Sequence, residues 1–164
     1  MKCIVAVDGQ WAIGWQNQLL FRIPEDLKRF RTITMGNIVL MGRKTFDSLP
    51  KKLDGRTHWV LTRATDFRPA DIRVFHTAEE AVTAARNTVQ DVFLIGGASV
   101  YAQCVNACDE IFVTKIEAVA QNADAYFCNL DVSRDWVAIE QGETQISRNG
   151  LRYAFWVYRK KSGV

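Results

Sequence analysis

Short apolar segments alternate with amphipathic segments over most of the chain. The apolar runs occupy residues 3–7, 37–42, 57–62, 72–75, 91–97 and 110–116. Several of these runs are almost continuously apolar, which is typical of strands that are covered on both faces. Helix-like segments lie between or after them, at 24–35, roughly 44–49, 78–87 and 98–106. Strands that alternate with helices in this way predict an α/β domain with a mostly parallel central sheet.

The C-terminal part of the chain has a different pattern. Two strand-like segments, 136–146 and 151–160, flank the residues SRNG. Asn149-Gly150 within them is a strong signal for a hairpin turn, so we expect an antiparallel hairpin at one edge of the sheet. No internal repeat, low-complexity segment or linker is found, and the length suits one core. We therefore predict a single domain over residues 1–164.

The helix predicted at 24–35 carries an acid in an unexpected place. Pro24 suits the first helical position, where a missing N–H costs little. The apolar face of the helix contains Ile23, Leu27 and Phe30. Asp26 falls on the shoulder of this face, where an ionised carboxylate is costly unless a partner meets it. Glu25 and Arg29, four residues apart, are expected to form an exposed pair.

Two interpretations of Asp26 are open from the residues alone. An acid in the first turn of a helix interacts favourably with the helix dipole and need have no other role. Alternatively, Asp26 meets a polar group of a ligand in an apolar pocket. Thr114, a polar residue in the apolar run 110–116, is similarly ambiguous, because threonine is a common strand former.

Composition narrows the classes of protein that the chain can be. Hydrophobic residues make up 48% of the 164 residues, which excludes a disordered tail, and the net charge of +3 is mild. Such a charge suits an anionic small molecule better than a nucleic acid. No apolar run is long enough to cross a bilayer or to form a secretory signal, so we expect a cytoplasmic protein without a membrane partner.

The cysteines give no metal-binding pattern. Cys3, Cys104, Cys108 and Cys128 include no CxxC pair. Cys104 and Cys108 share a helix face, but the chain has only two histidines to complete a metal site. We expect buried free thiols and no bound metal.

Two glycine-centred junctions between a strand and a helix are candidate phosphate-binding sites. The first is VLMGRKTFDSL (39–49), and the second is FLIGGASVYAQC (93–104). A helix N-terminus with nearby cationic side chains suits a phosphate, and paired glycines let a backbone approach a ligand. LTR (61–63) adds a hydroxyl and a guanidinium at a third strand end, a combination that could hold the 2′-phosphate of NADPH. Each junction alone is equally consistent with an ordinary turn.

These junctions belong to a longer ordered set of segments. The set is AIG (12–14), IPEDL (23–27), MGRKTFDSL (41–49), LDGR (53–56), LTR (61–63), FLIGGASVY (93–101), VTKI (113–116) and DAYF (124–127). In this order, from Lys2 to about Lys160, it resembles the dihydrofolate reductase family. The resemblance implies an eight-stranded, mostly parallel sheet with about four flanking helices. It also implies a monomer that binds NADPH, dihydrofolate and antifolate inhibitors, and that supports one-carbon metabolism and thymidylate and purine synthesis.

The resemblance implies roles for residues of a substrate pocket. Asp26 matches the acid that accepts hydrogen bonds from the ring N3–H and 2-amino group of dihydrofolate, and Thr114 would support it. Hydride would pass from the nicotinamide to C6 while N5 gains a proton from water. Leu19 and Phe21 would shape the reacting end. The residues that match the substrate-binding positions are Ile4, Ala6, Asp26, Leu27, Phe30, Leu49, Lys51, Arg56, Ile95, Tyr101 and Thr114. Among them, Arg56 would pair with the α-carboxylate of the glutamate tail.

The cofactor positions form a second set. They are Ala6, Ile13, Gly14, Asn17, Gln18, Leu19, Gly42, Arg43, Lys44, Thr45, Leu61, Thr62, Arg63, His76, Gly96, Gly97, Ala98, Ser99, Val100 and Tyr101. Residues 12–19 match a loop that closes over the nicotinamide. Asp124 matches an acid of a second loop that hydrogen-bonds back to the first.

The chain departs from the family pattern at several positions. Phe21 stands where tryptophan is common and lacks the indole donor to a pocket water. Leu20 replaces a proline, so a more mobile closing loop is expected. Ala123 replaces a glycine before the acid of the second loop. Lys51 stands where an arginine often contacts the glutamate tail, which predicts a weaker contact.

Two other functions remain as alternatives. A reductase on the same scaffold that acts on a ribosylated aminopyrimidine would share the cofactor junctions but would not require Asp26 or Arg56. A non-catalytic nucleotide-binding module would also explain the glycine junctions, but it gives Asp26 no purpose.

Overall fold

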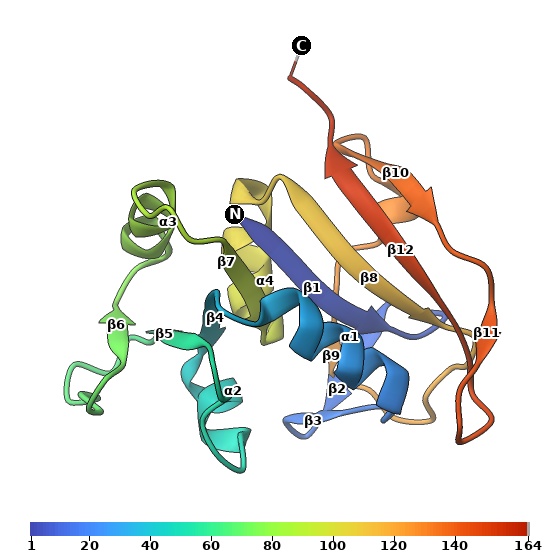
Figure 1. The fold of residues 1–164 in the computed structure, drawn as a ribbon, viewed down its shortest axis with the longest axis horizontal. Coiled ribbons are helices and arrows are strands. Elements are labelled where there is room, and N and C mark those ends of the chain that lie inside the picture. Colours follow the sequence, from blue (N-terminus) through green and yellow to red (C-terminus); the bar gives the residue numbers. More distant parts are fainter. Residues whose placement is uncertain (164) are drawn as a thin grey trace.

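A central sheet organises the computed structural model, which describes residues 1–163 (Figure 1). Its strands are β1 (Lys2–Val7), β4 (Ile38–Gly42), β5 (Thr57–Leu61), β6 (Arg73–Phe75), β7 (Val92–Gly96), β8 (Glu110–Ile116), β10 (Trp136–Gln141), β11 (Gln145–Ile146) and β12 (Arg152–Lys160). The strand order is β10-β12-β8-β1-β7-β4-β5-β6, and β11 pairs with β12 beside this path. The expected eight strands are confirmed as the continuous path, and β11 is a short ninth strand.

The strand directions agree with the sequence pattern. Strands β1, β4, β5, β6, β7 and β8 pair in parallel, whereas β12 is antiparallel to both β8 and β10. The C-terminal hairpin therefore lies at the edge, as predicted. Its β12 strand is inserted between β10 and β8, so the hairpin extends the sheet on the side of β8.

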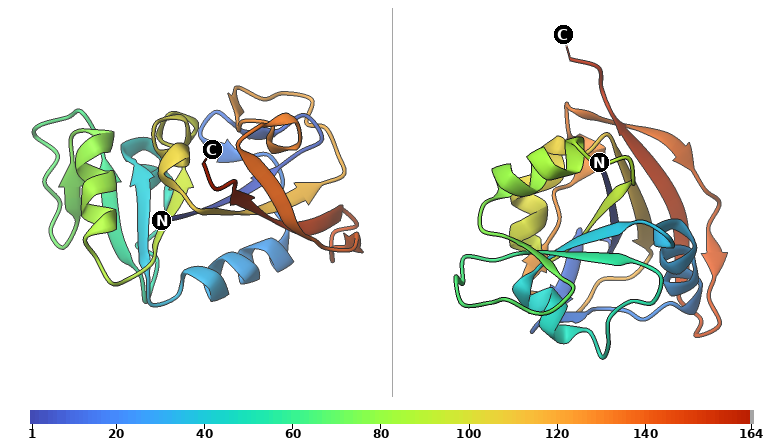
Figure 2. Two further views of the ribbon diagram at one scale, coloured as in Figure 1. Left: turned by 90° about the horizontal axis from the view of Figure 1, so that it is seen from above. Right: turned by 60° about the vertical axis from the view of Figure 1, so that its left-hand side comes forward.

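Helices cover both faces of the sheet. They are α1 (Pro24–Thr34), α2 (Arg43–Ser48), α3 (Ala78–Arg86) and α4 (Ala98–Cys104), with short 3-10 helices η1 (Val105–Ala107) and η2 (Leu130–Val132). All four α-helices start within one residue of their predicted positions. Figure 2 shows α1 and α4 on opposite sides of the sheet. None of the helices in the described part of the chain could span a membrane.

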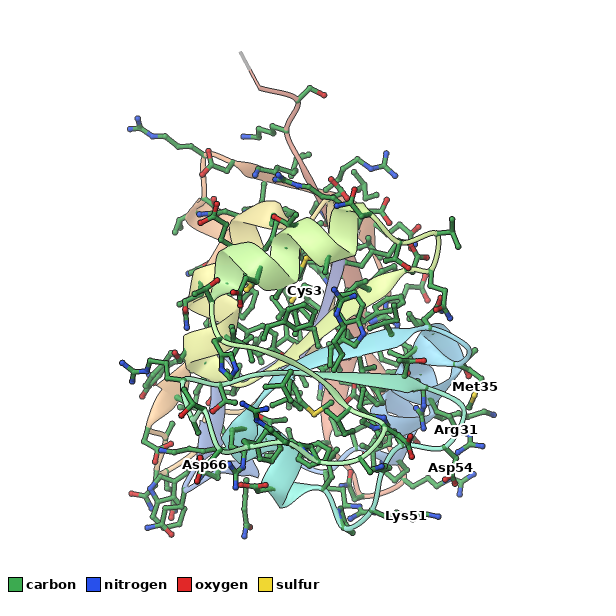
Figure 3. The ribbon with its side chains drawn as sticks, turned by 90° about the vertical axis from the view of Figure 1, so that its left-hand side faces the viewer. Cys3, Arg31, Met35, Lys51, Asp54 and Asp66 are labelled. Atoms are coloured by element: carbon green, nitrogen blue, oxygen red, sulfur yellow. The ribbon has the colours of Figure 1, made fainter. Side chains whose placement is uncertain are left out.

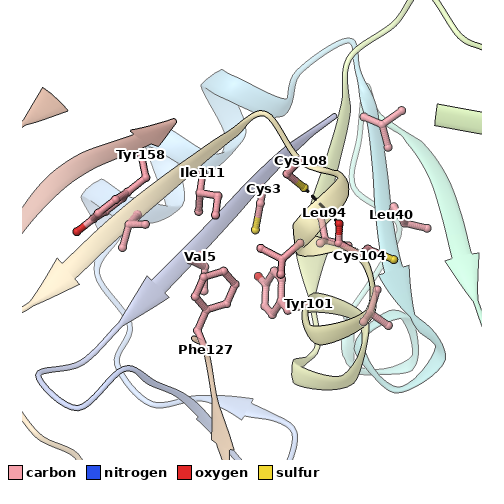
Figure 4. Close-up of a cluster of buried hydrophobic side chains, with 14 of the residues drawn as sticks. Cys3, Val5, Leu40, Leu94, Tyr101, Cys104, Cys108, Ile111, Phe127 and Tyr158 are labelled. Atoms are coloured by element: carbon pink, nitrogen blue, oxygen red, sulfur yellow. Dashed lines mark hydrogen bonds between the residues drawn. The ribbon is translucent and has the colours of Figure 1, made fainter. Parts of the chain in front are cut away.

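Alternation along the strands decides which residues meet which helix. On β1 and β8, the side chains of Cys3, Val5, Ile111 and Val113 join the large core under α4 (Figure 4). The intervening residues of the same strands therefore face α1 on the other side. Thr114 is one of these intervening residues. Its strand position thus places its hydroxyl on the same face of the sheet as α1.

A small second sheet lies beyond the central one and was not predicted. Its order is β3-β2-β9, formed by β2 (Ala12–Trp15), β3 (Gln18–Leu19) and β9 (Ala125–Tyr126). Gln16 and Asn17 join β2 to β3, and both have positive φ, as a tight hairpin of the type I′ class requires. Strands this short carry too few residues for an alternating pattern to be recognised.

Candidate active site

Asp26 and Thr114 form the polar centre of the site. The Thr114 hydroxyl, on β8, donates to Asp26 Oδ1 over 2.5 Å, and Thr114 is 1% exposed. This is the one protein hydrogen bond that the described residues offer to the Asp26 carboxylate. Burial raises the pKa of Asp26, while the hydrogen bond from Thr114 and the charge of Arg29 act in the opposite direction. The result is a partly buried acid with remaining capacity to accept hydrogen bonds.

Apolar side chains surround this acid on the α1 face of the sheet. Ala6 on β1 is the direct register partner of Thr114, and Ile4 lies two residues before it on the same face. Leu27 and Phe30 are half-buried on α1 beside Asp26. The opposite wall includes Leu49 and Ile95, which pack on one hydrophobic cluster. The structure therefore brings these apolar residues, all predicted to contact the substrate, to one side of the sheet, whereas Tyr101 packs in the core on the other side.

Arg56 lies beside the C-terminal end of α1. Its Nη1 donates to Thr34 Oγ1 over 3.2 Å, and that hydroxyl donates to the carbonyl oxygen of Phe30 over 2.7 Å. The Arg56 Nε is buried and has no partner in the described structure. Burial, and then the nearby charge of Arg31, lowers the pKa of Arg56. An unmet donor on a cation is a suitable partner for a carboxylate.

Lys51 lies at the same corner of the molecule, near the end of α1 (Figure 3). Its ammonium pairs with Asp54 over 3.3 Å, and both side chains are exposed. Met35, at the end of α1, packs against the turn at Gly55, where an added Cβ would lie 2.4 Å from the Met35 sulfur. Lys51 is thus engaged with Asp54, whereas Arg56 keeps an unpaired donor.

The loop of residues 12–19, called the first loop below, is held in place by two acids, Asp124 and Asp8. At its tip, Asp124 Oδ2 accepts from the backbone N–H of Gln16 over 3.0 Å, and the backbone N–H of Asp124 donates to Gly14. A small pocket lies beneath the loop and is lined by Ala6, Asp8, Ala12, Ile13, Leu19, Leu20, Phe21 and Ile116. Several of the residues predicted to meet the nicotinamide therefore lie together, although Leu19 itself is 63% exposed.

Asp8 is the second acid, and the sequence reasoning missed it. It follows β1 directly and is only 4% exposed. Its carboxylate accepts three backbone N–H groups, from Gln10, Ala12 and Ala120, each over 2.9 Å. These donors belong to both loops, so Asp8 joins the root of the first loop to the start of the second. An acid directly after a buried strand was the available signal.

The carboxyl ends of four neighbouring strands bring the glycine junctions together. In the register of the sheet, Gly96 pairs with Met41 on β4, Gly42 with Leu61 on β5, and Leu61 with Phe75 on β6. The segments after these residues therefore lie in a row along one edge. Residues 42–45, 61–63, 76 and 96–101, which the sequence assigned to a cofactor, all belong to this row.

Close packing at this edge requires small residues. A Cβ added to Gly42 would lie 2.9 Å from Val100, and one added to Gly97 would lie 3.4 Å from Thr45 Oγ1. Gly96 has φ of +127°, a conformation in which a side chain is strained. The two glycine junctions therefore touch each other, and side chains at these positions would separate them.

The charged side chains at this edge differ in whether they contact other protein groups. Arg43 Nε donates to Asp47, and its guanidinium lies 3.9 Å from the centre of the Phe67 ring. Lys44 and Arg63 are exposed. His76 Nδ1 lies 2.9 Å from the carbonyl oxygen of Thr62. The edge thus offers cationic side chains after β4 and β5 and an imidazole after β6.

Other predicted residues lie outside these contacts or differ from expectation. The predicted pair of Glu25 and Arg29 is wrong. Glu25 accepts a hydrogen bond from the backbone N–H of Arg148, and the Arg29 guanidinium lies over the ring of Phe155 on β12. Tyr101 donates its hydroxyl to the carbonyl oxygen of Ile4 over 2.8 Å, so it braces β1.

Three of the four thiols and the second histidine are buried, and the expectation of a buried thiol is wrong for Cys128. Cys3, Cys104 and Cys108 are buried and Cys128 is exposed, all unbridged. Burial raises the pKa of Cys108 to about 12. His58 is buried and accepts the backbone N–H of Leu53, and burial lowers its pKa. No cluster of three or more potential metal ligands occurs among residues 1–163.

Comparisons with known proteins agree on one family. The family model described as dihydrofolate reductase matches residues 1–160. The dihydrofolate reductase of Mycobacterium tuberculosis is 37% identical over 153 residues, which cover 90% of each chain. That of Bacillus subtilis is 34% identical over 161 residues, covering 97% of this chain and 94% of the relative. A solved structure of dihydrofolate reductase from Enterococcus faecalis, complexed with NADP(H) and the compound RAB-propyl, superposes with a TM-score of 0.87. The two are 27% identical over 98% of this chain and 96% of that one.

Proposed function

This chain belongs to the dihydrofolate reductase family, and from that premise we propose that it reduces dihydrofolate to tetrahydrofolate with NADPH. The single observation that carries the proposal is the pairing of Asp26 with Thr114 among the apolar side chains on the α1 face of the sheet. A carboxylate in such a place needs polar partners, and only one is supplied by the described residues. The N3–H and 2-amino group of a pteridine are donors that complete its hydrogen bonding.

The protein's part in the reaction is to bind, orient and polarise. When bound, NADPH supplies the hydride that C6 of the pteridine receives. Asp26 holds the ring edge and places a negative charge beside it, which favours the gain of a proton at N5. Thr114 fixes the direction of the carboxylate. The neighbouring acid, Glu25, is turned to the backbone N–H of Arg148, so water is proposed as the source of the N5 proton.

Arg56 supports a substrate with a glutamate tail. Its Nη1 is tied to Thr34, and its Nε remains unpaired in a partly buried position. A bidentate guanidinium contact with the α-carboxylate would satisfy this donor. The neighbouring positive charges of Arg31 and Lys51 favour an anionic tail at the same corner.

The edge formed by β7, β4, β5 and β6 fits a long anionic cofactor. Its touching glycine junctions allow close approach to phosphates, and Arg43, Lys44 and Arg63 supply positive charge near the end of β4 and β5. We assign the 2′-phosphate to this cationic end and the nicotinamide to the side of the site next to the first loop, residues 12–19. Antifolate inhibitors would occupy the Asp26 pocket. We propose that the enzyme acts as a cytoplasmic monomer, as the resemblance implies.

A direct assay separates this function from the alternatives. The purified chain is mixed with NADPH and either dihydrofolate or a ribosylated aminopyrimidine, and the absorbance of the reduced nicotinamide is followed. We expect consumption of NADPH with dihydrofolate alone, and slower consumption when NADH replaces NADPH. Reduction of the aminopyrimidine instead, or of neither compound, would contradict the proposal.

A further inference from the structure

Arg29 is a charged residue close to Asp26 that the proposed mechanism does not use. It lies one helical turn after Asp26 on α1, so the two side chains leave the same side of the helix. The Arg29 guanidinium lies 4.3 Å from the centre of the Phe155 ring and 5.6 Å from that of Phe112. Its Nη1 is 3.4 Å from the carbonyl oxygen of Val113. Arg29 is therefore held between α1 and the sheet and is not free in solvent.

The strands that hold Arg29 are those that hold Thr114. Phe155 on β12 is the register partner of Thr114, and Val113 precedes Thr114 on β8. The guanidinium thus lies beside the residue that donates to Asp26. Within residues 1–163, Arg29 makes no ion pair of 4 Å or less with Asp26, so any effect acts through space.

We propose that Arg29 is a positioning residue that keeps the Asp26 carboxylate ionised and thereby sets the pH at which this acid titrates. The inference deepens the proposed function, because an ionised Asp26 is the form that accepts both pteridine donors. It does not depend on turnover, since the charge of Arg29 acts on Asp26 whether or not a substrate is bound.

Physical chemistry explains why an arginine suits this place. A guanidinium stays charged in proteins, stacks on aromatic rings and is weakly hydrated, so it tolerates partial burial better than an ammonium. Away from solvent, its field is screened less by water and salt. Burial raises the pKa of Asp26, and the charge of Arg29 opposes that rise.

The other groups around Asp26 do not supply a second positive charge. From α1, Glu25 is negative and turns to the backbone of Arg148. From α4 and β12, Tyr101 and Tyr153 both have raised pKa values, which keeps them neutral near neutral pH. Burial lowers the pKa of Arg29, and the charges of Asp26 and of Glu140 on β10 act in the opposite direction. Arg29 is thus the one cation among the described groups that shift the pKa of Asp26.

The test is a titration of Asp26 in the full chain without substrate. Aspartate carboxyl groups are labelled with carbon-13, the Asp26 resonance is identified by its loss in D26N, and its chemical shift is followed with pH. In R29M, which keeps bulk but removes charge, we expect the midpoint to rise by more than about 0.3 pH unit, a twofold change in proton affinity. In R29K the midpoint stays within that margin of the wild type.

Lys28 provides the matched control. It is the neighbour of Arg29 on α1, carries the same charge and is exposed, so K28Q is expected to leave the midpoint within the same margin. A midpoint in R29M that does not rise, or an equal rise in K28Q or R29K, would overturn the proposal. If R29M does not fold, R29Q replaces it, because an amide can keep the bond to Val113 without the charge. Since no turnover is measured, failure of the proposed function would leave this result standing.

Discussion

Two acids at the same end of the sheet, the buried Asp8 and the partly buried Asp26, differ in how the protein satisfies them. Asp8 receives three backbone N–H groups from two loops. Asp26 receives one hydroxyl, from Thr114. A carboxylate that the chain itself satisfies can serve structure, whereas one left with unused acceptor capacity in an apolar wall suits a ligand. The number of donors that the protein supplies therefore predicts a structural role for Asp8 and a ligand-binding role for Asp26.

Removing the charge of Asp26 is expected to give the largest effect. D26N folds and binds NADPH, but its turnover of dihydrofolate near neutral pH falls by about a hundredfold or more, roughly 2.7 kcal/mol of transition-state stabilisation. The amide lacks the charge and cannot accept both pteridine donors. Steady-state kinetics measure the loss, with D135N, at an exposed acid, as the control. Turnover within about threefold of the wild type would defeat the role given to Asp26.

Removing Asp8 is expected to damage stability instead. D8A leaves three backbone N–H groups without their acceptor, at a cost of about 3 kcal/mol in the free energy of unfolding. Urea denaturation of D8A and D26N under the same conditions measures the difference. We expect a large loss in the free energy of unfolding for D8A and none for D26N. Equal losses would show that the two acids play the same part.

Thr114 is predicted to have an intermediate effect on the site. T114V keeps the shape of the side chain but removes the donor to Asp26, so the pKa of Asp26 rises and turnover near neutral pH falls by about tenfold. The pH profile of kcat/KM shows the change, and T57V, at an exposed strand threonine, is its control. An unchanged profile in T114V would mean that this hydrogen bond does not tune the acid.

The smallest predicted effect concerns the pH dependence of stability. Because the pKa of folded Asp26 lies above its ordinary value of 3.8, the folded state holds this proton more tightly than the unfolded state does. Stability is therefore lost as the pH rises from 3.8 through the folded pKa. D26N has no such carboxyl group and does not lose this stability. The difference between its free energy of unfolding and that of the wild type, measured by urea denaturation, should therefore grow from acidic to neutral pH. A difference in the free energy of unfolding that stays constant or shrinks as the pH rises would contradict this prediction.

Local sequence signals predicted the scaffold well because each element carries its own signal. Pro24 marks the start of α1, and Asn149-Gly150 marks the C-terminal hairpin. The glycine junctions could be placed at one edge because parallel strands share the direction of their carboxyl ends. For Asp26 and Thr114, the residues raised the question, and the family resemblance supplied the expected partner.

Features that depend on long-range contacts could not be predicted from the sequence. Spacing suggested that Arg29 would pair with Glu25, but the rings of Phe112 and Phe155 on distant strands hold it instead. Asp8 was missed because its donors include Ala120, far along the chain. The strands β2, β3 and β9 owe their existence to pairing between loops, since none is long enough to show a pattern of its own.

The most direct measurement is a crystal structure of this chain with folate and oxidised cofactor bound. The account predicts that the second oxygen of Asp26 and the one held by Thr114 together receive the ring N–H and the amino group of the pterin. A carboxylate that instead turns to bulk water, or a pterin bound elsewhere while this acid stays without a ligand donor, would contradict the central claim.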